Sequence, residues 1–214
     1  MPKPLNEQVI VITGASSGIG RATALMLARK GASVVLAARN DEALRQVQGE
    51  MVLFGGKSHV VETDVADWSQ VQRLADESVS HFGRIDTWIN DASVATYGTI
   101  EETPLEDIEK VIQINLMGVV YGCKAALPYL TAQESGQIIN VGSAISWRSA
   151  PLLGVYATAK QGVKGFTDAL RMELRRDHPG VDVTLILPGS INTPFFEHAK
   201  SNMGVQPRPL PPVY

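Results

Sequence analysis

The sequence predicts an α/β fold in which helices cover both faces of a doubly wound parallel sheet. Strand-like and helix-like patterns alternate along nearly the whole chain. The first strand contains the unbroken apolar run Val9–Ile12, which is typical of a parallel strand buried on both faces. A glycine turn, Thr13-Gly14-Ala15-Ser16-Ser17-Gly18-Ile19-Gly20, joins that strand to a helix. Because crossovers between parallel strands are right-handed, the intervening helices lie on both faces of the sheet.

Length and composition favour one globular domain over residues 1–214, in which residues 197–214 form a lid and a proline-rich tail. The chain has 214 residues, of which 44% are hydrophobic and 19% are charged. The net charge of −3 provides no basic field for nucleic acid or an anionic membrane. We therefore expect no nucleic-acid or membrane partner.

The chain is expected to be cytoplasmic. The segment Met1–Gln8 lacks the apolar core of a signal peptide, and no apolar run looks long enough to span a bilayer. The lone cysteine, Cys123, excludes an intrachain disulfide and fits a reducing compartment. The four histidines are scattered along the chain, so no metal site is expected.

The first half of the chain alternates strands with helices whose ends carry recognisable signals. Gly31 is placed to end the first helix, Gly55-Gly56 breaks the second, and Asp67 caps the third. The predicted elements are strand 9–13, helix 18–30, strand 33–38, a helix from 41 to the double glycine, strand 59–63, helix 67–82 and strand 86–90.

The second half continues the same alternation. A capping box is predicted at Thr103-Pro104-Leu105-Glu106, with proline at the first helical position. It predicts a helix that begins there and runs to about Pro128. Strand 137–143, helix 154–176 and strand 181–187 follow, and Pro188-Gly189 closes the last strand.

In such sheets ligands bind beyond the carboxyl ends of the strands. The glycine turn after the first strand presents backbone N–H groups and a helix N-terminus to an anion such as phosphate. The glycines of this turn are spaced as G-x-x-x-G-x-G. The alternative to phosphate binding is that the turn serves only tight packing between strand and helix. After the second strand, Arg39 could bind a 2′-phosphate or simply be an exposed arginine before a helix. After the third strand, Asp64 could accept a hydrogen bond from the amino group of an adenine, or it could only cap the local backbone.

Tyr156 and Lys160 lie four residues apart in a predicted helix, so they share one face. A free phenol has a pKa of about 10, roughly 3 units above neutral pH. A neighbouring ammonium and a cationic nicotinamide would stabilise the phenolate. Taken alone, Tyr-x-x-x-Lys is common in surface helices, and Ser143 could be an ordinary strand-end hydroxyl.

Together these pieces resemble the shorter-chain branch of the short-chain dehydrogenase/reductase family over about residues 5–196. The resemblance implies a Rossmann-like fold. The matching pieces, in chain order, are Thr13-Gly-x-x-x-Gly-x-Gly20, Asp64, Asn90, Asn115, Ser143, Tyr156-x-x-x-Lys160, Pro188-Gly189 and Thr193.

The resemblance implies a catalytic role for four side chains. Tyr156 would protonate a carbonyl oxygen in reduction or take a hydroxyl proton in oxidation. Lys160 would lower the pKa of Tyr156 and hold the nicotinamide ribose, and Ser143 would bind the substrate oxygen. Asn115 would bind a water that links Lys160 to solvent, and the alternative is a buried amide satisfied by backbone.

The implied cofactor is NADP(H), with NAD(H) less favoured because Arg39 is basic. Hydride would pass between C4 of the nicotinamide and the substrate carbon without a metal. The residues expected to contact the cofactor are Gly14, Ser16, Ser17, Gly18, Ile19, Gly20, Arg39, Asp64, Val65, Asn90, Ala92, Tyr156, Lys160, Pro188, Gly189, Ile191 and Thr193.

Two departures from the family pattern stand out. The usual Asn-Asn-Ala-Gly after the fourth strand is Asn90-Asp91-Ala92-Ser93, which adds a charge. Family members normally continue with another helix and a final edge strand, whereas this chain ends in the proline-rich segment 207–214. We therefore expect the last edge strand to be lacking or truncated.

The substrate is expected to be a small, largely apolar carbonyl or alcohol compound. The loops over the site contain Tyr97, Trp147, Leu152, Leu153, Phe195 and Phe196, which line a pocket or only pack the loops, and Arg148 could face a carboxylate. A homodimer or homotetramer is expected. The alternatives are a non-catalytic cofactor-binding or scaffold protein, and an epimerase or dehydratase that uses the same Tyr-Lys pair.

Overall fold

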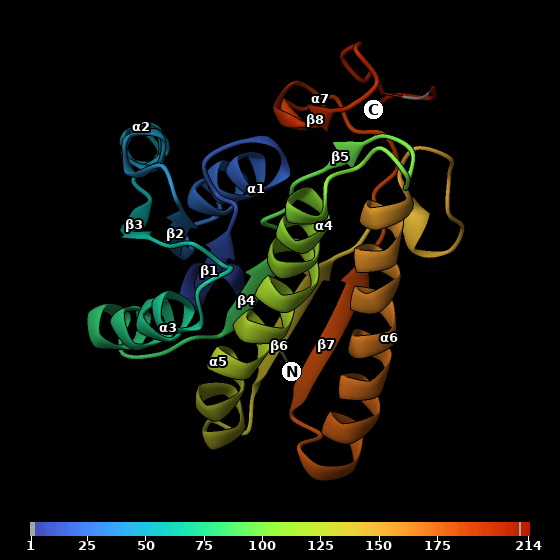
Figure 1. Cartoon of the computed structure of the whole chain (residues 1–214). Coiled ribbons are helices and arrows are strands. Elements are labelled where there is room, and N and C mark those ends of the chain that lie inside the picture. Colours follow the sequence, from blue (N-terminus) through green and yellow to red (C-terminus); the bar gives the residue numbers. More distant parts are fainter. Residues whose placement is uncertain (1–2, 210) are drawn as a thin grey trace.

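The computed structural model describes residues 3–209 and 211–214. Met1 and Pro2 of the N-terminal segment, and Leu210 of the proline-rich tail, lie outside the described residues. Six parallel strands form one sheet in the order β3-β2-β1-β4-β6-β7 (Figure 1). They are β1 (Val9–Thr13), β2 (Ser33–Ala38), β3 (Lys57–Glu62), β4 (Thr87–Asn90), β6 (Gly136–Val141) and β7 (Val181–Ile186). The predicted doubly wound parallel sheet is confirmed, and each strand lies within two residues of its predicted bounds.

Helices cover both faces of this sheet (Figure 1). The alternation within β1 shows why its sequence is continuously apolar: Ile10 and Ile12 enter one core with α1 and α2, and Val11 enters the other with α3, α5 and α6. The helices are α1 (Gly18–Arg29), α2 (Asp41–Val52), α3 (Trp68–Phe82), α4 (Leu105–Ile112), α5 (Gly118–Ala132), α6 (Gly154–Asp177) and the short α7 (Phe195–His198). Single turns of 3-10 helix lie at Leu5–Glu7 and Ala144–Ser146.

The start of α4 differs from the predicted capping box. The helix begins at Leu105, Pro104 is its N-cap residue, and no side chain caps it. The Thr103 hydroxyl instead donates to the backbone oxygen of Thr99 at 2.6 Å. A threonine hydroxyl can bond to the preceding turn as readily as to the following helix, and here the preceding turn is favoured.

A π-helical turn, Gln113–Met117, joins α4 and α5 into one continuous helix. By length and composition alone, Leu105–Ala132 could cross a membrane, contrary to the expectation that no segment is long enough. Half of its most apolar window is buried inside the protein, against α3, β4 and β6. Its apolar composition is therefore that of a core helix.

A two-stranded parallel sheet, absent from the sequence prediction, ties two loops together above the main sheet. It pairs β5 (Thr96–Tyr97) with β8 (Lys200–Ser201). The Lys200 ammonium forms an ion pair with Asp107 of α4 at 2.7 Å. The expected lid region beyond Phe195 is therefore anchored to α4 and to the loop after β4.

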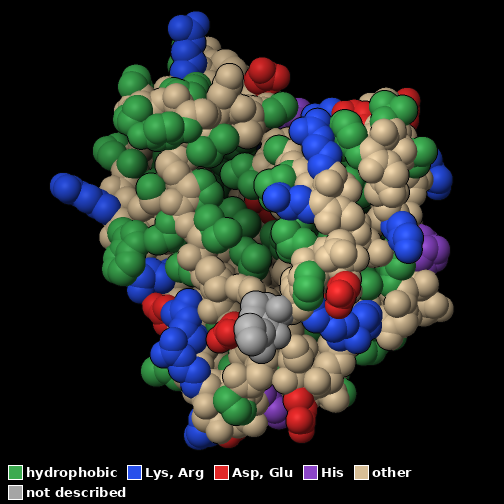
Figure 2. All heavy atoms as spheres, turned by 180° about the vertical axis from the view of Figure 1, so that it is seen from behind, with side chains coloured by type: hydrophobic (Ala, Val, Ile, Leu, Met, Phe, Trp, Pro, Cys, Tyr) green, Lys and Arg blue, Asp and Glu red, His purple; other side chains and the backbone are tan. Residues whose placement is uncertain are grey.

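The edge strand β7 leaves part of one sheet face uncovered. Figure 2 shows hydrophobic side chains around a hollow on the face opposite α5 and α6. Ile186 of β7 and Met26 of α1 are 46% and 48% exposed, respectively. Within the described residues no further strand pairs with the free edge of β7 in the main sheet.

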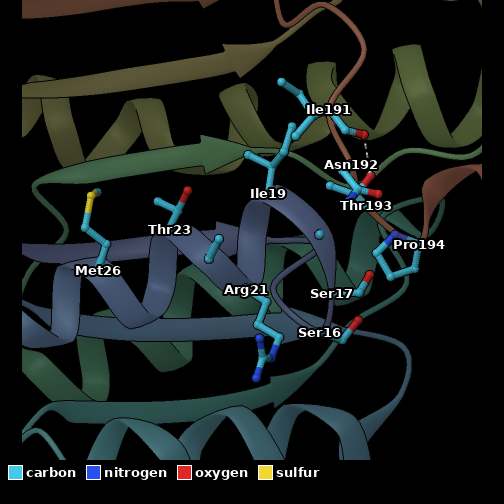
Figure 3. A pocket seen from close by; sticks show the side chains of 12 residues that line it. Ser16, Ser17, Ile19, Arg21, Thr23, Met26, Ile191, Asn192, Thr193 and Pro194 are labelled. Carbon is cyan, nitrogen blue, oxygen red and sulfur yellow. Dashed lines mark hydrogen bonds between the residues drawn. The ribbon is translucent and has the colours of Figure 1, made fainter. Parts of the chain in front are cut away.

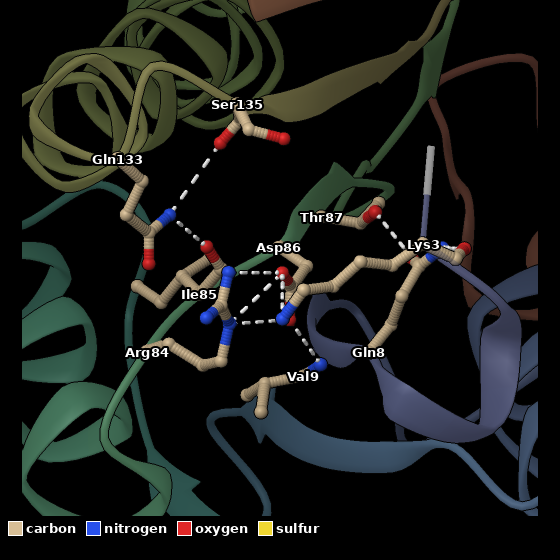
Figure 4. A network of polar contacts seen from close by, with 9 residues as sticks. All are labelled: Lys3, Gln8, Val9, Arg84, Ile85, Asp86, Thr87, Gln133 and Ser135. Atoms are coloured by element: carbon tan, nitrogen blue, oxygen red, sulfur yellow. Dashed lines mark hydrogen bonds and ion pairs between the residues drawn. The ribbon is translucent and has the colours of Figure 1, made fainter. Parts of the chain in front are cut away.

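A polar network fixes the amino ends of β1 and β4 (Figure 4). The buried Asp86 carboxylate accepts from the Val9 backbone N–H at 2.9 Å and from Arg84 Nε at 3.0 Å. Lys3 lies 3.5 Å from the same carboxylate. This network sits at the end of the sheet opposite the strand ends where the candidate site lies.

Candidate active site

The glycine turn after β1 lies directly against the loop after β4. Gly14 has a φ of +76°, and a Cβ there would come within 2.8 Å of the Ala92 backbone. A Cβ on Gly20 would clash with the Gly14 carbonyl oxygen and come within 2.9 Å of the Asp91 carboxylate. Only glycine fits at both positions. The turn is therefore shaped so that backbone, not side chain, borders the start of α1.

A groove of about 690 Å³ runs along the start of α1 (Figure 3). Its opposite wall is the loop after β7, and a Cβ on Gly18 would lie 3.5 Å from the Thr193 side chain. Six residues predicted to bind the cofactor line this groove together, namely Ser16, Ser17, Gly18, Ile19, Ile191 and Thr193. Arg21, Ala22, Thr23, Met26, Asn192 and Pro194 complete the lining.

The residues that follow β2 and β3 lie where a nucleotide would be recognised in this type of sheet. Arg39 is exposed immediately after β2, and its neighbour Asn40, not Arg39, caps α2. The Asp64 carboxylate accepts from the Ala66 backbone N–H at 3.0 Å, so one of its oxygens caps local backbone. Val65 is buried against Gly118 at the start of α5.

Asn90, at the end of β4, uses its side chain inside the protein. Its amide nitrogen donates to Asn140 at 2.9 Å, and its oxygen accepts from the Trp88 indole at 2.8 Å. Only its backbone therefore remains to border a ligand. In the loop after β7, the Pro188 carbonyl accepts a hydrogen bond from the Ala144 backbone N–H at 2.9 Å. The next residue, Gly189, is exposed.

Tyr156 and Lys160 share one face of α6, as their spacing predicts. The Lys160 ammonium lies 5.7 Å from the centre of the Tyr156 ring. It donates to the Val141 carbonyl at the end of β6 at 2.8 Å, and the residue is only 2% exposed. Burial lowers the pKa of Lys160 to about 8.

Burial raises the pKa of Tyr156 to about 12. The nearby hydroxyls of Ser143 and Ser93 act in the opposite direction. The sequence led us to expect that the neighbouring ammonium would lower this pKa. In the structure desolvation of the phenolate outweighs the favourable contacts, so the phenol is protonated at neutral pH.

Ser143 is held in place by the turn that it begins. Its hydroxyl accepts from the Ile145 backbone N–H at 3.3 Å, and its backbone N–H donates to the Ser146 hydroxyl at 3.2 Å. These reciprocal bonds cap the short helix after β6. They keep the Ser143 side chain beside Tyr156.

Asn115 lies in the π-helical turn and is fully buried. Its side-chain oxygen accepts from the Val94 backbone N–H at 2.9 Å, and its nitrogen donates to the Val94 carbonyl at 2.7 Å. This matches the alternative of an amide satisfied by backbone. The amide also fixes the loop that carries Asp91 and Ser93.

Two residues that the motif comparison marked only as departures reach the site. The Asp91 carboxylate is buried and interacts electrostatically with Lys160, and the Ser93 hydroxyl lies beside the Tyr156 phenol. Ser93 Oγ is buried and has no hydrogen-bond partner in the described part of the chain. The departure of Asn90-Asp91-Ala92-Ser93 from the family pattern was the available signal for these two residues. Nothing in the sequence predicted how deeply their side chains are buried.

The aromatic residues expected over the site divide into two groups. The Phe195 ring lies 5.7 Å from the Tyr156 ring, and partly buried Tyr97 is close enough to Tyr156 to influence its pKa. Trp147 is 69% exposed and lies against the Lys164 ammonium at 4.4 Å. The apolar wall beside Tyr156 therefore comes from the loops after β4 and β7.

In the described ranges 3–209 and 211–214, no three His, Cys, Asp or Glu side chains are placed to hold a metal ion. Cys123 is buried, and burial raises its pKa to about 12, so it is not an activated thiol.

Comparisons with known proteins agree with this geometry. The family model for short chain dehydrogenases matches residues 8–204. The uncharacterized oxidoreductase YxnA of Bacillus subtilis is 46% identical over 206 residues, which are 96% of this chain but 58% of that protein. The chain thus spans well under two thirds of the length of this relative. The putative oxidoreductase SadH of Mycobacterium tuberculosis is 37% identical over 90% of this chain and 70% of its own length.

Solved structures show the same fold. A short-chain dehydrogenase/reductase from Burkholderia phymatum in complex with NAD superposes with a TM-score of 0.89 at 31% identity, covering 96% of this chain and 72% of that one. An alcohol dehydrogenase from the archaeon Thermococcus sibiricus, complexed with 5-hydroxy-NADP, gives 0.84 at 29% identity, covering 90% and 80%. With its parallel sheet, its glycine turn and a match over nearly its whole length, the chain belongs to the short-chain dehydrogenase/reductase family.

Proposed function

We propose that this protein is an NADP(H)-dependent oxidoreductase that interconverts a carbonyl group and a secondary alcohol. The observation that carries the proposal is the arrangement of Tyr156 and Lys160 on one face of α6, with the Ser143 hydroxyl beside the phenol. The glycine turn suits a dinucleotide, because it brings the N-terminus of α1, with its free backbone N–H groups, to the groove that Gly18 lines. Ser16, Ser17, Ile19, Ile191 and Thr193 line the adjoining groove and would hold the cofactor.

When bound, the nicotinamide supplies or accepts the hydride. In reduction, the Tyr156 hydroxyl gives its proton to the substrate oxygen, and in oxidation the phenolate takes the proton back. The Ser143 hydroxyl donates a hydrogen bond to the same substrate oxygen and stabilises the charge that develops there. The Lys160 ammonium stabilises the phenolate left after proton transfer. Phe195 and Tyr97 exclude water from one side of Tyr156 and favour an apolar substrate.

The protonation state of Tyr156 predicts different pH dependences for reduction and for oxidation. Its pKa is raised to about 12, so the proton that carbonyl reduction requires is already on the phenol. Alcohol oxidation requires the phenolate, whose population grows as the pH rises toward the pKa. Reduction is therefore expected to be nearly flat through neutral pH, and oxidation to accelerate as the pH rises toward about 8, the pKa of Lys160, above which the phenolate loses its stabilising ammonium.

Replacing Tyr156 by Phe tests the catalytic assignment. General acid–base groups typically contribute a factor of about 10² to 10⁴, so kcat for carbonyl reduction should fall by at least about a hundredfold. Binding of NADPH, measured by fluorescence titration, should remain within about threefold, because the change removes one hydroxyl remote from the phosphates. The matched control is Tyr129→Phe in α5, whose hydroxyl bonds to Asp76 far from the site. An unchanged kcat in Tyr156→Phe contradicts the assignment and favours a non-catalytic, cofactor-binding role.

NADP(H) is proposed over NAD(H) because exposed Arg39 follows β2 and can pair with a 2′-phosphate. A charge-assisted contact of about 1.5–3 kcal/mol corresponds to a factor of roughly 10 to 150 in affinity. Arg39→Ala should therefore weaken NADPH at least about tenfold and leave NADH nearly unchanged. Arg45→Ala, which removes an exposed arginine paired with Asp41, is the control. Equal losses for the two cofactors would count against the 2′-phosphate contact.

We also propose that the protein acts in the cytoplasm as a homodimer or homotetramer on a small, largely apolar substrate. Apolar residues that are exposed on β7 and α1, including Ile186 and Met26, support self-association, since such surface is stabilised when covered. Light scattering coupled to size exclusion tests this, and a monomer at micromolar concentration contradicts it.

A further inference from the structure

The segment that follows β7 returns over the site as a lid, which we define as residues 195–202. It contains α7 and β8 and lies above β5 and the start of α4 (Figure 1). Its first residue, Phe195, places its ring 5.7 Å from the Tyr156 ring. Phe196 packs edge-on against Phe195, with the two ring centres 5.6 Å apart. The lid therefore supplies one wall of the space beside Tyr156.

The backbone pairing that holds this lid is short. The Lys200 backbone N–H donates to the Ala95 carbonyl at 3.0 Å, and the Asn202 N–H donates to the Tyr97 carbonyl at 2.8 Å. These bonds belong to the pairing of β5 with β8, which is only two residues long in each strand. Such a short pairing contributes little against the conformational entropy of an ordered loop, so a further contact is needed to keep the lid closed.

The side chain of Lys200 supplies such a contact. Its ammonium donates to Oδ1 of Asp107 at 2.9 Å and lies 2.7 Å from Oδ2 of the same carboxylate. The Asp107 side chain is only 8% exposed, whereas that of Lys200 is 52% exposed. Within residues 3–209 and 211–214, no other group donates a hydrogen bond to this carboxylate. Opening the lid would therefore leave a buried carboxylate without its counter-charge, which is unfavourable.

Asp107 belongs to a packed frame that also carries Tyr156. It lies in the first turn of α4, and Val111 of the same helix packs in one apolar cluster with Val155 and Ala159 of α6. Tyr156 lies between those two residues in the sequence of α6. The ion pair therefore ties the lid to the helix packing that positions the phenol.

We propose that the ion pair between Lys200 and Asp107 is a latch that keeps the lid closed over the substrate position. The two residues are positioning residues, because they act through the Phe195 wall beside Tyr156 and not on the reacting atoms. An open lid would remove the apolar surface against which an apolar substrate packs, so the latch acts on substrate affinity and not on proton transfer. The latch is a property of the lid alone, and its effect on substrate rests on the proposed function.

Lys200→Met tests the latch without substrate, because methionine keeps an unbranched side chain and removes the charge. Amide hydrogen exchange, followed by mass spectrometry, reports how often the lid opens. Peptides that cover residues 195–202 should exchange at least about tenfold faster than in the unaltered protein. Lys200→Arg keeps the charge and should restore slow exchange. Lys110→Met, which removes an exposed lysine from α4 itself, is the matched control and should leave the exchange of the lid unchanged. Equal exchange of the lid in Lys200→Met and in the unaltered protein overturns the latch.

Steady-state kinetics test the positioning role, with NADPH and a carbonyl compound found by screening for loss of NADPH absorbance. If the closed lid falls to about one tenth of the population, the apparent affinity for substrate falls about tenfold. KM for the carbonyl compound should therefore rise about tenfold in Lys200→Met, whereas kcat and the Kd of NADPH should stay within about threefold. Lys200→Arg should bring KM back toward its original value. An unchanged KM, or a loss confined to kcat, overturns the positioning role.

Asp107→Asn measures the same contact from the other partner. Combined with Lys200→Met, it should raise KM no further than either substitution alone, because one ion pair cannot be broken twice. Additive effects would mean that the two residues act separately, which overturns the latch. If Asp107→Asn does not fold, the variants of half-exposed Lys200 still decide the question. The exchange experiment needs no substrate, so its failure leaves the oxidoreductase proposal standing. Full turnover by Tyr156→Phe would remove that proposal and leave the exchange result intact.

Discussion

Asp91 and Lys160 are ionisable side chains held away from water, and both are less stable as ions in the folded protein than in the unfolded chain. The pKa of Asp91 is raised from 3.8 to about 6, mainly by burial. That of Lys160 is lowered from 10.5 to about 8, also by burial. Burying these two charges therefore lowers the stability of the fold.

The raised pKa of Asp91 predicts a specific pH dependence of stability. A group whose folded pKa is raised contributes stability that is fully present below its unfolded pKa and lost as the pH rises through the folded value. For Asp91 that window runs from about pH 4 to pH 6. Between pH 4 and pH 7, the free energy of unfolding of Asp91→Asn should gain on that of the unaltered protein by about 2 kcal/mol.

Urea unfolding of both proteins at several pH values measures this difference. Other carboxylates titrate equally in the two proteins and cancel. Parallel stability curves across the window would show that Asp91 is solvated, contrary to the structure. A difference that changes in the opposite direction would mean that electrostatic attraction by Lys160 outweighs the cost of burying the carboxylate.

At the residue scale, the sequence predicts which side chains meet better than it predicts their hydrogen bonds. The four-residue spacing of Tyr156 and Lys160 places them on one helix face in any helix. Asn115 and Thr103, in contrast, each have several partners within reach, and only the packed structure decides that Asn115 bonds to Val94 and Thr103 to Thr99. Burial has the same limit, since no local pattern gives the depth of Asp91.

At the element scale, Asp86 fixes the start of β4 next to β1. Its carboxylate satisfies the Val9 backbone N–H and pairs with Arg84 and Lys3 (Figure 4). The amino end of the sheet thus depends on one buried side chain, whereas the opposite end holds the candidate site.

Asp86→Ala should lower the free energy of unfolding by about 2–3 kcal/mol, because a buried N–H loses its partner and Arg84 loses its counter-charge. Cofactor affinity should change less than twofold, since the network lies at the far end of the strands. Asp182→Ala on β7, an exposed carboxylate, should change stability by less than about 0.5 kcal/mol. Equal effects of the two substitutions in chemical denaturation would contradict the assigned role of Asp86.

The main elements were predictable because each carries a sequence signal over several residues or at its ends. The strand β1 is an unbroken apolar run, and aspartate and glycine mark the two ends of α3. The β5–β8 sheet was not predictable, because two-residue strands carry no alternation and their pairing depends on loops about a hundred residues apart. The π-helical turn at Gln113–Met117 likewise has no distinctive sequence pattern.

At the scale of the whole molecule, the parallel sheet explains why the site could be anticipated. Parallel strands bring their carboxyl ends to one edge, so the glycine turn after β1, Asp91 after β4 and Ser143 after β6 converge although they are far apart in sequence. The identity of the substrate could not be anticipated. The described loops that border Tyr156 carry no charged side chain placed as clearly as the four predicted catalytic residues, Asn115, Ser143, Tyr156 and Lys160.

The most direct measurement of the proposed chemistry is the fate of a deuterium label. NADPH deuterated at C4 is mixed with excess enzyme and a carbonyl compound found by screening for loss of NADPH absorbance. Mass spectrometry of the alcohol should show one deuterium on the carbinol carbon, and Tyr156→Phe should yield almost none over the same time. A substrate that is converted while all deuterium stays in the nicotinamide, or that gains a solvent proton at that carbon, would contradict hydride transfer and point to epimerase or dehydratase chemistry.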